Sequence, residues 1–289
     1  MKDRVTAREL VQRIEENVKA LASLTDEVRK SDLFKSYLYS MSRFWRYSHY
    51  NQILIRISMP KATRVAGIMT WNTFGRRVMA GEHGIRILAP IFRKPDSMEC
   101  GDDDVAEIRF ITKSVFDITQ TEGTPMPEME IDIHGNDLEW LMKRLTAACA
   151  ENGIPVEYAD LGEHGNYGQA TRDGITLNTH RGLNTQVNTL VHEMAHWLLH
   201  IHVKSKPTKV EREIEAEGVA YVVLLHFGVE SLGFNYLAGY LADAKQILAR
   251  LKAISAASRS IIGMLEPKDD AGVDPDQSQT NTAAKVGAM

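Results

Sequence analysis

The sequence predicts an α+β protein with two folded domains, and three observations carry this prediction. Apolar residues recur at helical spacing between residues 3 and 58. Short runs of β-branched and aromatic residues follow between residues 65 and 118. The second half then combines helical patterns with short strands near residues 154–158 and 170–177. We therefore expect N-terminal helices with a small antiparallel sheet, and a mixed domain after them.

The expected N-terminal elements can be placed by residue range. Helical periodicity predicts one helix over 3–30 and a second over 31–58, which Pro60 ends because proline cannot continue the hydrogen-bonding pattern. Strands are expected at 65–69, 85–91, 107–110 and 115–118, and the polar, acidic stretch 94–105 reads as an exposed excursion. In the second half we expect helices after Asn136, over the segment after Thr185 and from Lys209, and two further helices at 235–253 and 255–265.

A change of composition marks the boundary between the domains. Gly123, Pro125 and Pro127 lie in one short polar stretch, which is typical of a linker. We expect an N-terminal domain over 1–123 and a C-terminal domain over 131–265. Residues 266–289 are polar and lack apolar periodicity, which predicts a disordered tail.

Composition narrows the cellular setting. The chain has 289 residues, a formal net charge of −4 and two cysteines, which are too few for a disulfide framework. The N-terminus does not resemble a signal peptide, and no apolar run reaches the roughly 18 residues that a membrane span requires. We expect a cytoplasmic protein that does not enter a membrane.

A basic block indicates an anionic partner. Between Met41 and Lys94 ten arginine and lysine residues accompany a single acidic residue, Glu82, so the local charge is +9. Aromatic residues interleave with these cations, a combination that holds single-stranded nucleic acid through base stacking inside a cationic groove. Two alternatives require no nucleic acid: a solvated basic face without a partner, and aromatic residues that belong to the hydrophobic core. For Trp45 and Phe74 we expect a position in the core. The residues predicted to bind single-stranded DNA are Arg46, Tyr50, Asn51, Trp71, Arg76 and Arg77.

The motif His192-Glu193-Met194-Ala195-His196 predicts a metal site. Two histidines four apart lie on one face of a helix, so both imidazoles can reach one cation. The glutamate between them can act as the catalytic base on the water that the cation activates. Zn²⁺ suits imidazole and carboxylate ligands best, although Mn²⁺ or Fe²⁺ is compatible with the same donors.

A hydrolytic zinc site needs a third protein ligand, and the residues leave three interpretations open. His202 stands six residues after His196, but Leu199 occupies the position at which a metzincin carries the glycine that turns the chain. Glu213 and Glu217 share one face of the next helix, so one can bind the metal while the other supports a ligand histidine. In the third interpretation the site is degenerate, which would leave Glu193 without a purpose.

These residues resemble a known family. The C-terminal half, with the histidine motif followed by Glu213-Ile214-Glu215-Ala216-Glu217, resembles the ImmA/IrrE-type metallopeptidases and the protease-like domain of ArdC antirestriction proteins. The N-terminal segments 51–54, 69–74, 78–85 and 115–123 are similar to the single-stranded-DNA-binding domain of ArdC-like proteins. The resemblance covers roughly residues 35–255, and Arg212 stands where such proteins often have the first of two paired glutamates.

The resemblance implies a site and a role. Zinc would be held by His192, His196 and Glu213, with Glu193 as catalytic base and Glu217 supporting a ligand histidine. The fold would join a single-stranded-DNA-binding domain to a zincin-like metallopeptidase domain. The role would be antirestriction on a mobile genetic element. The alternative is a regulatory peptidase that cleaves a specific protein, such as a repressor, and uses DNA for localisation.

Overall fold

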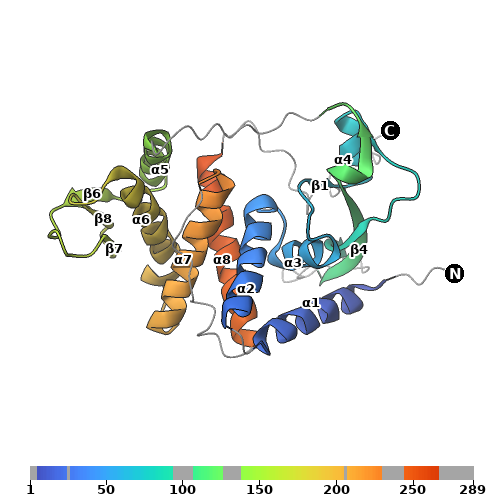
Figure 1. The fold of residues 1–289 in the computed structure, drawn as a ribbon, viewed down its shortest axis with the longest axis horizontal. Coiled ribbons are helices and arrows are strands. Elements are labelled where there is room, and N and C mark those ends of the chain that lie inside the picture. Colours follow the sequence, from blue (N-terminus) through green and yellow to red (C-terminus); the bar gives the residue numbers. More distant parts are fainter. Residues whose placement is uncertain are drawn as a thin grey trace, which may run out of the picture. The chain divides into compact units, whose positions relative to one another are not determined.

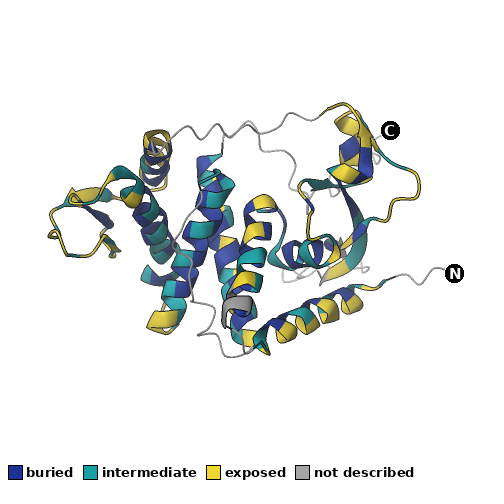
Figure 2. Ribbon diagram, in the orientation of Figure 1, coloured by how far each residue is buried: buried dark blue, intermediate teal, exposed yellow. Residues whose placement is uncertain are grey.

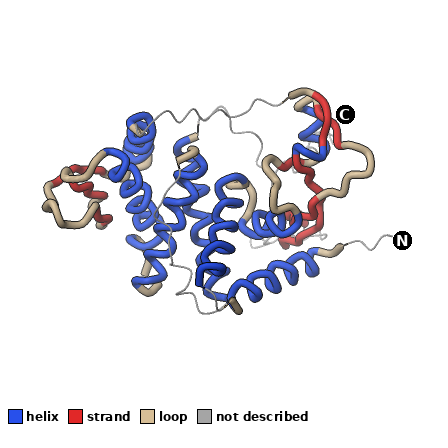
Figure 3. Tube along the Cα trace, in the orientation of Figure 1, coloured by secondary structure: helices blue, strands red, loops and turns tan. Residues whose placement is uncertain are grey.

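The computed structural model describes residues 5–24, 27–93, 107–125, 138–204, 207–229 and 244–266. The chain divides into two compact units (Figure 1). Of the described residues, 5–17, 46–93 and 107–125 belong to the first unit, and the others belong to the second. Helices and small sheets occur in both units (Figure 3), so the predicted α+β class is confirmed.

A long antiparallel hairpin is the centre of the first unit. Strand β3 (Ile85–Arg93) pairs with β4 (Glu107–Asp117) along its whole length, from Ile85 opposite Val115 to Arg93 opposite Glu107. Strand β1 (Val65–Ala66) pairs with the other edge of β4, which gives the order β1-β4-β3. The runs predicted as separate strands at 107–110 and 115–118 therefore form one strand, because β3 offers hydrogen-bonding partners to the residues between them as well.

A second, smaller ribbon lies in the same unit. Helix α4 (Ile68–Thr73) leads into β2 (Arg76–Val78), which pairs antiparallel with β5 (Thr121–Gly123) after the 3₁₀ turn η1 (Ile118–Gln120). Gly75 makes the turn between α4 and β2 at a φ of 68°, a conformation that glycine adopts without strain. The strand predicted over 65–69 is only two residues long, because α4 begins at Ile68 with Gly67 as its N-cap.

The predicted helix over 31–58 is two helices. Helix α2 (Glu27–Arg43) ends before Ser48, whose side chain accepts a hydrogen bond from the backbone N–H of Asn51 and so starts α3 (His49–Ser58). Helix α1 (Ala7–Ala22) precedes them. The predicted end before Pro60 is confirmed, since α3 stops at Ser58. The apolar pattern runs through the break, which is why periodicity alone does not reveal it.

Two buried polar side chains hold the first unit together. The amide of Asn51 on α3 donates to the carbonyl of Leu88 on β3 at 2.8 Å and accepts from the N–H of Leu88 at 2.9 Å. The carboxylate of Asp117, at the end of β4, accepts hydrogen bonds from the backbone N–H groups of Thr63, Arg64 and Thr119. These bonds satisfy backbone groups that lie away from water, and they fix the loops around the two sheets.

The second unit is a helical layer with a small sheet. Helices α6 (Leu183–His196), α7 (Lys209–His226) and α8 (Ala244–Leu265) pack together, and α2 packs against α7 and α8. Buried residues line α7 and α8 in Figure 2. Helix α5 (Glu139–Glu151) packs on α6. The sheet has the order β6-β8-β7, with β6 (Val156–Ala159) parallel and β7 (Gly168–Ala170) antiparallel to β8 (Ile175–Asn178).

Several predicted elements and boundaries differ from the structure or lie outside its described residues. One helix, α8, covers the range 244–265 for which two helices were predicted, and the start of the first at 235–243 lies outside the described residues. The expected excursion at 94–105 and the expected tail from residue 267 onward lie outside them as well. Residues 18–45 group with the second unit because α2 packs on α7 and α8, so the compact units divide the chain differently from the predicted domain ranges. Among the described helices, none combines the length and apolarity that a membrane crossing requires.

Replacing Asn51 by alanine should destabilise the first unit. The change removes both partners of Leu88 and leaves a buried N–H and a buried carbonyl unsatisfied, at about 1–3 kcal/mol for each group. Urea unfolding followed by tryptophan fluorescence measures the loss, because Trp71 is buried in the same unit. Asn72→Ala, at an exposed position on α4, is the matched control. Equal stabilities of the two variants would contradict the assigned role of Asn51.

Candidate metal centre

Helix α6 carries the histidine motif with a fixed orientation. Its residues Val187, Leu190, Val191, Met194 and Ala195 are fully buried and define the face that packs into the core. The side chains of His192 and His196 leave the helix on another face and are 15% and 14% exposed. Packing of the apolar face therefore sets the direction in which both imidazoles point, toward α7.

Helix α7 supplies the facing carboxylates. Its first turn is a capping box, in which the Thr208 side chain accepts from the N–H of Glu211 while the Glu211 carboxylate accepts from the N–H of Thr208. The buried residues Ile214, Gly218 and Val222 seat the helix in the core. Glu213 and Glu217, one turn apart, then lie on the side that faces α6.

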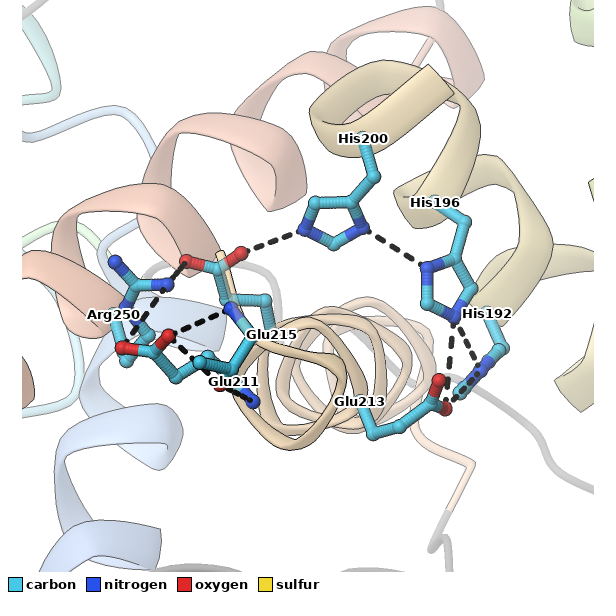
Figure 4. A network of polar contacts seen from close by, with 8 residues as sticks. His192, His196, His200, Glu211, Glu213, Glu215 and Arg250 are labelled. Atoms are coloured by element: carbon cyan, nitrogen blue, oxygen red, sulfur yellow. Dashed lines mark hydrogen bonds and ion pairs between the residues drawn. The ribbon is translucent and has the colours of Figure 1, made fainter. Parts of the chain in front are cut away.

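Three side chains meet at one point. The two Nε2 atoms of His192 and His196 are 3.0 Å apart, and Oε2 of Glu213 lies 3.5 Å from the first and 3.7 Å from the second (Figure 4). All three ligand atoms lie within 4.8 Å of one another. Donors at about 2.0–2.2 Å from a tetrahedral zinc ion are roughly 3.3–3.6 Å from each other. The donor set therefore fits a single divalent cation.

Interactions within this cluster shift the pKa values of Glu213 and His192. The polar contacts of Glu213 with His192 and then His196 hold the pKa of its carboxyl far below the usual range. Burial lowers the pKa of His192, but the hydrogen bond with Glu213 and the charges of Glu217 and Glu193 outweigh it, so the net pKa is raised. Glu213 is thus ionised at neutral pH, as a metal ligand must be.

Glu193 has the environment of a base. Its side chain is buried, and burial raises its pKa, opposed by the two imidazoles and by a hydrogen bond from the backbone N–H of Ala170 on β7. A carboxylate with a raised pKa accepts a proton more readily than one in water. Glu217 lies 3.7 Å from Nδ1 of His192, and burial raises its pKa too. The predicted neighbourhood of Glu217 and a ligand histidine is therefore present.

The structure separates the other histidines of the motif region from the three ligand atoms. After His196 the helix continues as a π-helical segment, η2 (Trp197–Ile201), and does not turn away at Leu199. His202 follows its end, exposed, with its ring against Trp197 at 4.8 Å between centroids. His200 is buried and contacts His196 through Nδ1, on the side of the ring away from Nε2. This arrangement favours Glu213 over His202 as the third ligand.

Two residues near the cluster, Glu215 and Arg250, were not predicted from the sequence to belong to it. Together with His200 they form a chain of contacts behind His196, in which His200 and Glu215 are buried and Arg250 is partly exposed. The repeated spacing of four from His192 to His196 to His200 was the one available signal, since it places three imidazoles along one helix face. Glu215 and Arg250 lie on other helices, so the sequence around the histidine motif does not indicate them.

The residues predicted to bind DNA lie in different environments in the first unit. Arg76 and Arg77 line an open groove of about 530 Å³ with Asn72, Gly75, Glu122 and Gly123. Arg76 donates to the side chain and carbonyl of Thr121 and to the carbonyl of Thr124. Arg77 is exposed and pairs with the exposed Glu122 at 2.8 Å. Arg46 and Tyr50 are half-buried, and the Tyr50 ring lies 4.2 Å from that of His49.

Two of the predicted contacts need correction, and one expected core residue is exposed. Asn51 is 1% exposed, and its side-chain amide is hydrogen-bonded to the backbone of Leu88. Trp71 is 2% exposed and donates its indole N–H to the carbonyl of Phe116. Neither side chain is available to a ligand at the surface of this unit. Phe74, by contrast, is 48% exposed beside the groove residues and is not a core residue as expected. The short helix α4 buries only one of its sides, which carries Trp71, so Trp71 is buried and Phe74 is exposed.

Comparisons with known proteins found one matching family model and similar solved structures. Residues 149–228 match the model of the IrrE N-terminal-like domain, Peptidase_M78, which confirms the resemblance of this part to IrrE-type proteins. The solved structures with similarity include the antirestriction protein ArdC from plasmid R388 in a metal-free form, at 16% identity, TM-score 0.49, and coverage of 76% of this chain and 85% of that chain. Its Mn(II)-bound form matches at 15% identity, TM-score 0.46, and coverage of 77% and 86%. No curated protein matches this sequence.

Replacing Glu213 by alanine should abolish tight metal binding. The change removes one of three donors and the negative charge that offsets the cation. Purified protein dialysed against trace zinc and measured by inductively coupled plasma mass spectrometry should lose most of its bound metal. Glu211→Gln is the matched control on the same helix, since glutamine keeps the acceptor of the capping box. Unchanged zinc content in Glu213→Ala would remove Glu213 from the ligand set.

Proposed function

We propose that this chain is a metal-dependent peptidase whose active site is formed by His192, His196, Glu213 and Glu193. The observation that carries the proposal is the meeting of the three ligand atoms within 4.8 Å, with a buried glutamate between the two histidines. The match of residues 149–228 to a peptidase family supports the same assignment. We assign this activity to the domain over 131–265, with Zn²⁺ as the preferred ion and Mn²⁺ or Fe²⁺ as compatible ones.

The protein's own residues can carry the proton chemistry. When bound, a divalent cation would lower the pKa of water and polarise the carbonyl of a peptide bond. Glu193 would accept the proton of the attacking water and return it to the leaving amine, and its raised pKa suits both steps. Glu217 would hold His192 in place through Nδ1.

We further propose that the N-terminal domain over 1–123 binds single-stranded DNA. The support is the groove beside β2 and β5, where exposed Arg77 offers a phosphate contact. Half-exposed Phe74, next in the chain to the lining residue Gly75, offers a stacking surface. Arg76 forms the wall of the groove, held by its bonds to Thr121 and Thr124. Arg46 and Tyr50 remain proposed contacts, whereas Asn51 and Trp71 are left out because they are buried.

The biological role that we propose is antirestriction of the ArdC type, on a mobile genetic element and in the cytoplasm, where restriction enzymes meet incoming DNA. It rests on the resemblance of residues 51–54, 69–74, 78–85 and 115–123 to ArdC-like proteins. The second candidate is a regulatory peptidase of the ImmA/IrrE type that cleaves a specific protein. The match of residues 149–228 to the IrrE N-terminal-like domain supports it.

A Glu193→Gln variant tests the peptidase assignment. Glutamine keeps the size of the side chain but cannot take up a proton, so the variant should bind zinc like the wild type and lose proteolysis. Extracts of host cells incubated with either protein are compared for newly formed peptide N-termini by mass spectrometry. Cleavage products common to both proteins would refute the assignment.

The same variant decides between the two roles. Transformation of a restricting strain with unmodified plasmid measures antirestriction in vivo. Protection that survives in Glu193→Gln identifies DNA binding as the protective activity, whereas protection that is lost with zinc content and stability intact identifies proteolysis.

Paired substitutions test the DNA groove. Arg77→Ala should weaken binding of a thymidine oligonucleotide and reduce the salt dependence by about 0.7 in the log–log slope, the value for one phosphate contact on a single strand. Glu122→Gln should strengthen binding, because its carboxylate competes with phosphate for Arg77. Fluorescence anisotropy at several salt concentrations gives both quantities.

Arg172→Ala, at an exposed position in the second unit, controls for the loss of a positive charge. If Arg77→Ala and Arg172→Ala weaken binding equally, the groove is not the binding site. The same conclusion follows if Glu122→Gln has no effect.

A further inference from the structure

A continuous chain of polar contacts begins at the back of a proposed metal ligand. Nδ1 of His196 lies 2.9 Å from Nδ1 of His200, and Nε2 of His200 lies 2.7 Å from Oε2 of Glu215. The other carboxylate oxygen of Glu215 forms an ion pair with Arg250 at 3.0 Å. Figure 4 shows the chain running from the helix of the histidine motif across α7 to Arg250.

His200 and Glu215 are buried, and Arg250 is largely covered, so burying these polar groups costs free energy unless each has a partner. The side chains of His200 and Glu215 are 1% and 3% exposed, and that of Arg250 is 15% exposed. A buried carboxylate needs a compensating charge and hydrogen bonds, and Arg250 and His200 supply them. Arg250 lies on α8, Glu215 on α7 and His200 in η2, so three elements must be in place to complete the chain.

The directions of these hydrogen bonds follow from the Glu215 carboxylate, at which the series ends. The Glu215 carboxylate can only accept, so Nε2 of His200 carries the hydrogen and donates to it. A neutral imidazole with hydrogen on Nε2 has a free lone pair on Nδ1. Nδ1 of His200 therefore accepts a hydrogen bond from Nδ1–H of His196. This leaves Nε2 of His196 without hydrogen, with its lone pair in the cluster that contains Glu213.

We propose that His200, Glu215 and Arg250 are positioning residues for the metal centre: they fix the tautomer and the ring orientation of His196, so that its Nε2 is presented to the cation. The proposal rests on the proposed metal site. A ligand histidine that donates its other ring N–H to an acceptor is held in one orientation and becomes a stronger donor to the metal. Here the acceptor is a second histidine, whose own tautomer is fixed by the buried carboxylate of Glu215 and its ion pair with Arg250.

The test compares zinc affinities of folded apo-proteins, measured by competition with a chromophoric chelator. His200→Leu replaces the imidazole by an apolar side chain of similar size and so removes the acceptor. It should weaken zinc binding by about 10–100-fold, the usual effect of losing such a partner. His200→Asn places an amide oxygen near the position of Nδ1, so it should recover part of the affinity that His200→Leu loses. Glu215→Gln should weaken zinc binding as well, because an amide can present its N–H₂ to His200 and reverse the chain.

Two further readouts separate positioning from simple support of the fold. Thermal unfolding of each apo-variant reports stability, and the visible spectrum of the Co(II)-substituted protein reports the geometry of the ligands. The exposed His202 offers a matched control as His202→Asn, which should leave both the zinc affinity and the cobalt spectrum unchanged.

The outcomes are distinct. Weaker zinc binding with a changed cobalt spectrum in His200→Leu, partly rescued in His200→Asn, supports the proposal. Lower thermal stability with unchanged affinity and spectrum overturns it and leaves the proposed metal site standing. A wild-type protein that binds no zinc and no cobalt overturns the metal site and the positioning role together.

Discussion

Packing of the apolar face of α6 is the constraint on which the candidate site depends. Val187, Leu190, Val191, Met194 and Ala195 have no exposed surface, so the helix cannot rotate about its axis without exposing them. His192 and His196 are consequently held toward α7, and the close approach of Gly218 to Ile254 fixes α7 against α8 in turn. The ligand atoms therefore converge because of hydrophobic contacts made elsewhere on the same helices.

The convergence of these side chains can be expected from the sequence because the information is local. The spacing of His192 and His196 and the shared face of Glu213 and Glu217 follow from helical geometry alone, and the structure brings these side chains together. The choice of Glu213 over His202 also depends on a local feature, since Leu199 does not end the helix. Resemblance to a family then distinguished two glutamates that geometry left equivalent.

The remainder could not be predicted because it depends on tertiary contacts. Glu215 and Arg250 approach His200 from α7 and α8, which begin 13 and 48 residues after α6 ends at His196. Asn51 and Trp71 carry polar atoms and suit a DNA surface by composition, yet both satisfy a backbone group inside the core. The break between α2 and α3 is set by the cap at Ser48, which interrupts an otherwise continuous apolar pattern.

The side chain of Glu213 is 43% exposed, whereas its partners on α6 are nearly covered. An ion held there would have solvent on one side, so it could enter and leave while the helices stay folded. Occupancy would then follow the free metal concentration around the protein at any moment, instead of recording what was present when the chain folded. A centre of this kind behaves as a reversible ligand equilibrium, and its stabilising effect on the fold would rise and fall with the supply of metal.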